Sequence, residues 1–340
     1  MTTASEAPAP APATDPATPP PVRGWRRLLR LWPWFLGAGI IVFLVRRVPV
    51  RAFRDAMSHG PHLEMASFVV AQQLVGLGLD SFATWANLWA VRLTVPLRRL
   101  AVVRAASYLL ALVHYSLGQG GIGYYLHKRG TKAVYATGTV LMMIGINLAA
   151  LGVLSGVSLL LGSQHGLPPA IGWTVAAVCA GFTLYLGLIA LRPAPLLRVQ
   201  LFAPLFEAGV RRHLLALAAR LPHTMWFVVA QWMALRIWGI HVPFLQGMLL
   251  LPVLGLLASL PLTPAGLGVA QASQVLLFHS FAPGATMEQR KAYVLVYSIV
   301  VYVYGVITVA GIGLAALPAA RRVQAETVPV PTPSADARVT

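Results

Sequence analysis

The chain has 340 residues, of which 57% are hydrophobic and only 10% are charged. An ordinary soluble domain carries about 25% charged residues, so this composition excludes that class and predicts a polytopic, all-α membrane protein. The net charge of +17 comes from short basic groups that flank apolar runs, which is typical of a membrane protein and excludes a nucleic-acid partner.

The length is sufficient for about eight membrane segments of ~20 residues each. Residues 1–22 are rich in Ala, Pro and Thr, and we expect a disordered tail there. The transmembrane domain is predicted over residues 23–317. Its first span, residues 31–45, follows four arginines and lacks a cleavage site, so we expect it to be retained. Residues 51–62 are predicted to be a short connection.

Asp80 lies in the second apolar segment, residues 63–91. A carboxylate near the middle of a bilayer is costly and usually faces the interior of the helix bundle. Asp80 is therefore a candidate substrate-binding residue. The alternative is a purely structural pairing with an Arg or Tyr of a neighbouring helix, and the sequence leaves both open.

A glycine-rich stretch at residues 118–123 follows an apolar piece, residues 101–114, that is too short to span comfortably. Four glycines in six residues disfavour a helix, so we predict a break between two half-length apolar pieces; the alternative is a surface loop. The candidate substrate-binding residues in this part of the chain are Arg104, Gly118, Gln119, Gly120, Gly123, Tyr124, His127 and Arg129.

Four further helices are expected before the next break. Residues 134–161 and 170–191 are predicted to be full spans that form a hairpin. In residues 205–221 apolar side chains recur at helical spacing, which predicts an amphipathic helix in the membrane interface with Arg220 away from its apolar face. Residues 222–240 are predicted to be the next span.

A second break is predicted at the Pro/Gly-rich residues 261–268, between apolar pieces 242–260 and 267–282. Backbone that is not helical is tolerated at membrane depth only inside protein or beside a watery cavity, so we expect two half-helices that meet at a binding site. A helix kink or an external loop is the alternative. The candidate substrate-binding residues here are Pro261, Pro264, Gly266, Gly268 and Gln271.

The last span is predicted at residues 292–317, followed by a disordered tail over residues 318–340. Arg and Lys concentrate at segment ends that face inside if the N-terminus is cytoplasmic, although residues 46–54 oppose this locally. The predicted fold is then about six full transmembrane helices plus two re-entrant broken helices that enter from opposite sides. Such paired interruptions indicate an inverted repeat with a binding site at its interface.

The two interrupted stretches, residues 120–129 and 260–269, resemble the flippase-like transmembrane region of bacterial lysylphosphatidylglycerol synthases and its stand-alone relatives. The resemblance covers most of residues 31–317 and implies an integral membrane lipid translocase without the soluble aminoacyl-transferring domain. Where relatives typically read Gly-Leu-Gly-Val-Arg-Glu, this chain has Ala270 and Gln271 at the two charged positions. Tyr124 and His127 replace the acid and the Arg that follow the first glycine-rich loop.

The leading prediction is a multi-pass protein of the cytoplasmic membrane that binds and moves an anionic lipid or a lipid-linked substrate. The half-helix N-terminus at residues 264–268 would favour the phosphate, and Arg104, His127, Lys128 and Arg129 would recruit headgroups. No nucleotide-binding or hydrolase motif is present, and no two His form an i, i+4 pair within a span, so we expect neither an enzyme nor a metal or cofactor. The alternatives are a non-transporting scaffold or accessory subunit, motivated by Ala270 and Gln271, and a lipid-modifying enzyme.

Overall fold

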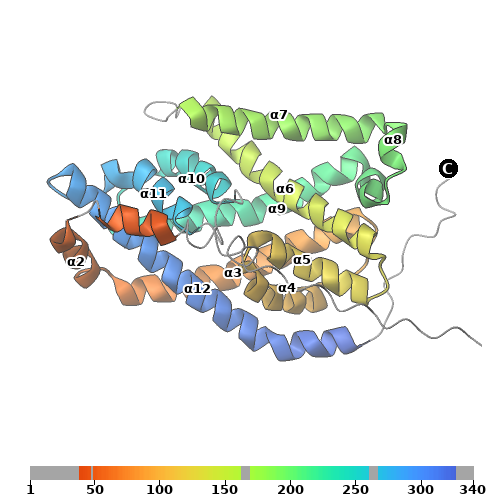
Figure 1. Ribbon diagram of the computed structural model, residues 1–340, viewed down its shortest axis with the longest axis horizontal. Coiled ribbons are helices and arrows are strands. Elements are labelled where there is room, and N and C mark those ends of the chain that lie inside the picture. Colours follow the sequence, from red (N-terminus) through yellow and green to blue (C-terminus); the bar gives the residue numbers. More distant parts are fainter. Residues whose placement is uncertain (1–37, 47–48, 162–168, 260–266, 327–340) are drawn as a thin grey trace, which may run out of the picture. The chain divides into compact units, whose positions relative to one another are not determined.

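The structure is a computed structural model that describes residues 38–46, 49–161, 169–259 and 267–326 (Figure 1). All regular secondary structure in these ranges is helical, as expected. The elements after residues 38–46 are α2 (Val50–Ser58), α3 (His62–Ala90), α4 (Leu97–Ala111), α5 (Tyr115–Lys128), α6 (Ala133–Leu160), α7 (Pro169–Leu191), α8 (Ala194–Leu197), η1 (Gln200–Phe202), α9 (Ala203–Ile237), α10 (Phe244–Ser259), α11 (Val269–Phe278), η3 (His279–Phe281) and α12 (Met287–Ala325).

Four of the described helices are long and apolar enough to cross a membrane, and each corresponds to a predicted segment. They are His62–Ala90, Ala133–Leu160, Gly172–Leu191 and Met287–Ala325. Of the first predicted span, residues 38–45 are described and helical and residues 31–37 lie outside the described residues; α9 combines its apolar part with several arginines. The total of six full spans with two re-entrant segments therefore stays a prediction.

The glycine-rich residues 118–123 are helical, so the break predicted there is wrong in position. They lie inside α5, and the chain leaves the helix upstream, at residues 112–114. The glycines are explained by close packing of α5 on α4. A Cβ on Gly118 would lie 2.6 Å from Ala111 Cβ, and one on Gly121 would lie 2.9 Å from Ser107 Cβ. This tight contact offsets the low helix propensity of glycine. The two half-length helices on either side of a break are present, as predicted.

Helix α9 joins two elements that the sequence separated. The predicted interfacial helix and the following span both belong to α9, Ala203–Ile237, which is kinked at Gly209, where the backbone is not helical (φ 63°, ψ 169°), and which continues through Pro222. The indole Nε1 of Trp226 donates to the carbonyl of Gln72 at 3.1 Å, which holds α9 against α3. Tertiary packing therefore outweighs the helix-breaking tendency of Pro222.

Two further boundaries differ from the sequence-based expectation. Residues 51–62, predicted to be a connection, contain most of α2. Helix α12 continues past the expected end of the last span to Ala325, so residues 318–325 are helical instead of tail. The guanidinium of Arg129 explains this extension, because its Nη2 donates to the carbonyls of Val323 at 3.2 Å and Glu326 at 3.1 Å.

The order of a long helix, two half-length helices and another long helix occurs twice, as α3–α4–α5–α6 and as α9–α10–α11–α12. The packing is reciprocal: α3 lies on α9, α6 packs on α10 of the second series, and α12 packs on α4 of the first. Gly255 of α10 faces Leu151 of α6, and Gly313 of α12 faces Leu109 of α4, with no room for a Cβ between them. Each half-length pair is thus held between long helices from both series.

Candidate functional site

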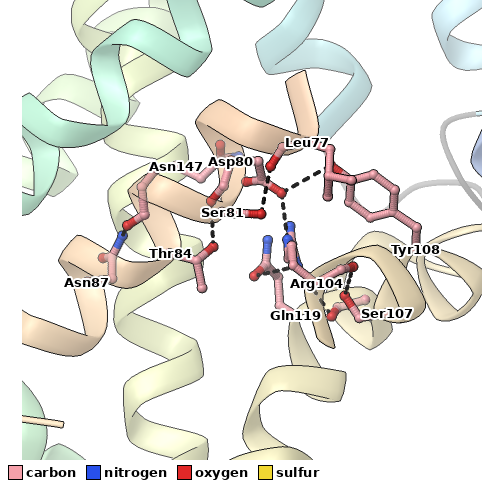
Figure 2. A network of polar contacts seen from close by, with 12 residues as sticks. Leu77, Asp80, Ser81, Thr84, Asn87, Arg104, Ser107, Tyr108, Gln119 and Asn147 are labelled. Carbon is pink, nitrogen blue, oxygen red and sulfur yellow. Dashed lines mark hydrogen bonds and ion pairs between the residues drawn. The ribbon is translucent and has the colours of Figure 1, made fainter. Parts of the chain in front are cut away.

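Asp80 lies in the second half of α3, and only 2% of its surface is exposed. Its two carboxylate oxygens bind two different arginines. Arg104 Nε donates to Oδ2 at 2.5 Å, and Arg220 Nη1 donates to Oδ1. The hydroxyl of Tyr108 is a third, longer donor, 3.4 Å from Oδ2. Figure 2 shows the side chains of Asp80, Arg104 and Tyr108 converging between their helices. We call Asp80, Arg104 and Arg220 the Asp80 cluster.

Arg104 connects Asp80 to the first half-length pair. It is part of α4, it is 5% exposed, and its Nη1 points to α5, 3.4 Å from the carbonyl of Gly118 and 3.3 Å from Oε1 of Gln119. Two oxygen atoms of the glycine-rich helix α5 therefore accept hydrogen bonds from this guanidinium. The close packing at Gly118 brings α5 near enough for these contacts.

Arg220 connects Asp80 to α6. It is 6% exposed, and Oδ1 of Asn147 accepts hydrogen bonds from its Nε at 3.0 Å and its Nη2 at 2.7 Å. With these contacts the cluster joins side chains of α3, α4, α6 and α9 and reaches α5 through Gln119. Residues from both halves of the chain thus form one buried polar network. Both long helices of the first series contribute to it.

The Asp80 cluster has a formal charge of +1, because two guanidiniums share one carboxylate. A buried charge is strongly disfavoured unless it is paired, and here two guanidiniums are paired with the same carboxylate. His223, one turn after Arg220 on α9, interacts electrostatically with all three members of the cluster. Its Nδ1 is buried and has no hydrogen-bond partner among the described residues. The site therefore offers both positive charge and an open hydrogen-bonding position.

Three polar side chains that follow Asp80 on α3 bond to their own helix. Ser81, Thr84 and Asn87 each donate to the carbonyl four residues earlier, at 2.7, 2.8 and 2.7 Å (Figure 2). Such bonds satisfy polar groups locally inside an apolar bundle. Asp80, in contrast, binds side chains of α4 and α9.

The predicted site residues of the first half separate into two groups. Asp80, Arg104, Gly118 and Gln119 lie together in the cluster. The structure places four others away from it. Gly120 is exposed, Gly123 packs against Val140, Tyr124 is exposed beneath the ammonium of Lys128, and His127 bonds through Nδ1 to the carbonyl of Thr131 at 3.2 Å.

Arg129 belongs to a separate location. It is 7% exposed, its guanidinium lies over the ring of Tyr125 at 5.3 Å, and it donates to the last turn of α12. The sequence placed Arg129 beside His127 and Lys128 as one basic triplet. The structure shows that Arg129 points inward while the other two are exposed.

In the second half, the side chain of Gln271 closes the start of α11. Its Oε1 accepts the N–H of Gly268 at 2.6 Å, Gly268 has a φ of 82°, and Gln271 is 2% exposed. This geometry explains the glycine, because few other residues adopt a positive φ. The candidate residues Pro261, Pro264 and Gly266 lie outside the described residues.

Four residues at the site were missed by sequence reasoning: Tyr108, Asn147, Arg220 and His223. Asn147 was recognisable as a polar residue in an apolar run. Arg220 was not singled out, because its helix also carries Arg211 and Arg212 and was read as interfacial. The predicted alternative for Asp80, a pairing with an Arg or Tyr, is present with both residue types.

Comparison with known families identifies the transmembrane part of the chain. A family model described as the lysylphosphatidylglycerol synthase TM region matches residues 30–317. A search of curated proteins finds no significant match. The matched range includes every member of the Asp80 cluster and both half-length pairs.

Proposed function

The chain belongs to the lysylphosphatidylglycerol synthase TM-region family and is a multi-pass membrane protein, and we propose that it binds the phosphate of an anionic lipid and moves that lipid across the bilayer. The binding site in this proposal is the Asp80 cluster. The membrane is the cytoplasmic membrane, with the N-terminus on the cytoplasmic side. The chain leaves the lipid chemically unchanged and uses neither a metal nor a cofactor.

The observation that carries this proposal is the surplus guanidinium. Two buried arginines share the carboxylate of Asp80, so these three side chains together carry one more positive than negative charge. A lipid phosphate supplies the balancing negative charge and accepts several N–H bonds at once, which matches the planar fork of an arginine. Nδ1 of His223 adds a hydrogen-bonding position beside Arg220 for a phosphate or hydroxyl group.

The arrangement of helices supports movement of the bound lipid. The order of long and half-length helices occurs twice, and the two series pack reciprocally. Repeats of opposite orientation around a site at the bilayer midplane favour alternating access, in which one repeat rocks against the other. Asp80 and Asn147 belong to the first series and Arg220 belongs to the second, so such a motion would change the cluster itself.

A second candidate is a membrane scaffold that does not transport lipid. It is favoured by the observation that Asp80 and Arg220 are already satisfied by protein partners, and that the side chain of Gln271 is used to close α11. In that case the cluster only holds the helices together. The two candidates differ in whether an added anion binds at the cluster and whether lipid moves.

Transport is tested by reconstituting the full chain into liposomes with a fluorescent phosphatidylglycerol and measuring its loss from the outer leaflet to a membrane-impermeant quencher. We expect the protein to accelerate transbilayer movement, and Asp80→Asn to abolish the acceleration. Glu288→Gln, which alters an exposed acid in the first turn of α12, is the matched control and keeps the wild-type rate. No acceleration for any anionic lipid would support the scaffold, and a new lipid species in the extract would indicate an enzyme.

A further inference from the structure

A second group of basic side chains lies at the place where α4 begins and α5 and α12 end. Arg99, in the first turn of α4, forms an ion pair with Glu326 at 2.8 Å, from Nη2 to Oε2. Arg129, just after α5, donates through Nη2 to the carbonyls of Val323 and Glu326. Two arginines from different elements thus converge on oxygen atoms at the end of α12.

A buried hydroxyl without a partner lies at the same place. Tyr125 is fully buried beneath the guanidinium of Arg129, and its hydroxyl has no hydrogen-bond partner among the described residues. Arg129, Arg99 and Glu326 lie near enough to interact with it electrostatically. A buried hydroxyl without a partner is costly. A ligand oxygen bound between these residues would remove that cost.

The contacts of Arg99 and Arg129 at the end of α12 differ in how easily a ligand could replace them. The bonds of Arg129 are buried and satisfy carbonyl groups at a helix C-terminus, where a cation is favourable. The ion pair between Arg99 and Glu326 is accessible to solvent, with side-chain exposures of 35% and 53%. An exposed ion pair contributes little to stability, so the carboxylate of Glu326 is the replaceable part.

We propose that Arg99, Arg129 and Tyr125 form a second anion-binding site, which takes a phosphate at the membrane surface and in which the carboxylate of Glu326 is a tethered competitor. A phosphate has enough oxygen atoms to accept from the fork of Arg99 and from the hydroxyl of Tyr125 together, which a single carboxylate oxygen of Glu326 does not. This inference goes beyond the proposed function, because the site would bind phosphate even if the chain moved no lipid.

The surroundings favour an anionic lipid as the source of the phosphate. Arg98 is exposed next to Arg99, and Arg321 and Arg322 lie in the last turns of α12, about one turn before Glu326. Basic residues at the end of membrane helices are attracted to anionic headgroups. The same chemistry would also accept free inorganic phosphate, so the experiment separates the two sources.

The test measures binding of a short-chain fluorescent phosphatidic acid to the purified full chain in a neutral detergent, by fluorescence anisotropy. We expect Glu326→Gln to tighten binding by up to about fivefold, because it removes the competitor. Arg99→Ala is expected to weaken binding about tenfold and Tyr125→Phe about fivefold. Arg98→Ala, which removes the same charge from the neighbouring position, is the matched control with less than about a twofold effect.

Each measurement is repeated in the Arg220→Gln background, which weakens the Asp80 cluster and so isolates this surface site. Competition then identifies the source: if inorganic phosphate displaces the probe only in large excess, the ligand is a lipid headgroup, and if it competes equally, the ligand is free phosphate. The proposal is overturned if Glu326→Gln leaves the affinity unchanged, or if Arg98→Ala weakens binding as much as Arg99→Ala. Failure of lipid transport by the wild type would leave these outcomes unaffected.

Discussion

The two half-length helix pairs occupy equivalent positions in the chain order but treat polar groups in different ways. The first pair, α4 and α5, brings Arg104 and Gln119 to the buried carboxylate of Asp80. Helices α10 and α11 of the second pair contain no Asp, Glu, Lys or Arg, and the side chain of Gln271 bonds to its own helix. The two pairs therefore share the order of their helices but differ in their charged side chains, and we expect anion recognition to be concentrated in the first pair.

The largest effect on stability is expected when the carboxylate of Asp80 is removed. Asp80→Ala leaves two buried guanidiniums without their carboxylate, and removal of one partner from a buried pair costs about 3–5 kcal/mol. We expect a large fall in the unfolding temperature in detergent, which is measured by tryptophan fluorescence. A free energy of unfolding within about 1 kcal/mol of the wild-type value would contradict the central role of Asp80.

The next largest effect on stability is expected at the close contact between α4 and α5. Gly118→Ala places a Cβ 2.6 Å from Ala111 Cβ, and overpacking of this kind costs about 1–3 kcal/mol. Gly120→Ala is the matched control on the same helix, because a Cβ there meets nothing within 4 Å. It should stabilise α5 by about 0.5–1 kcal/mol through helix propensity. Opposite signs of the two changes in unfolding temperature would confirm the packing; equal effects would argue against it.

These glycines show why the fold could be predicted only in part. Four of the spans predicted from hydropathy and length correspond to helices that are long and apolar enough to cross a membrane, and two half-length helices are present around the first break. The position of that break was missed because glycine lowers helix propensity locally, whereas the contacts of Gly118 and Gly121 with α4 are tertiary. No periodicity in the sequence reveals which helix a glycine faces.

The site was predictable to a similar extent. Asp80 and Arg104 stood out because they are charged groups within or beside apolar runs, and they do pair. Arg220 did not stand out, since it was assigned to an interfacial helix together with Arg211 and Arg212, and only the packing of α9 on α3 and α6 buries it. Charge in the sequence indicates which residues are costly to bury, but their partners depend on helix packing.

A smaller effect is expected from the second pair. Gln271→Ala removes the acceptor for the N–H of Gly268 at the start of α11, and loss of a helix cap costs about 1 kcal/mol. We expect a modest fall in unfolding temperature and no change in lipid selectivity. If Gln271→Ala altered which lipid is moved while stability stayed the same, the second pair would take part in recognition, and the asymmetry between the pairs would be wrong.

The smallest effect is expected at Tyr108. Its hydroxyl is 3.4 Å from Oδ2 of Asp80, at the limit of a hydrogen bond, while its ring packs near the guanidinium of Arg104. Tyr108→Phe keeps the ring and should cost about 0.5 kcal/mol, at the low end for a hydrogen bond. Chemical denaturation in detergent measures this loss of stability. Tyr124→Phe, which makes the same change at an exposed position, is the control. A loss above about 2 kcal/mol would show that the hydroxyl is a principal ligand of Asp80.

The central claim is that the surplus positive charge of the Asp80 cluster binds an anionic lipid, and replacement of Arg220 tests it most directly. Arg220→Gln leaves Asp80 paired with Arg104 and sets the formal charge of the cluster to zero, whereas Arg220→Lys keeps the charge. The rate of transbilayer movement is measured in liposomes for phosphatidylglycerol and phosphatidylcholine in parallel. We predict that Arg220→Gln abolishes acceleration of phosphatidylglycerol and that Arg220→Lys retains part of it. Wild-type rates in Arg220→Gln, with the protein folded, would contradict the claim.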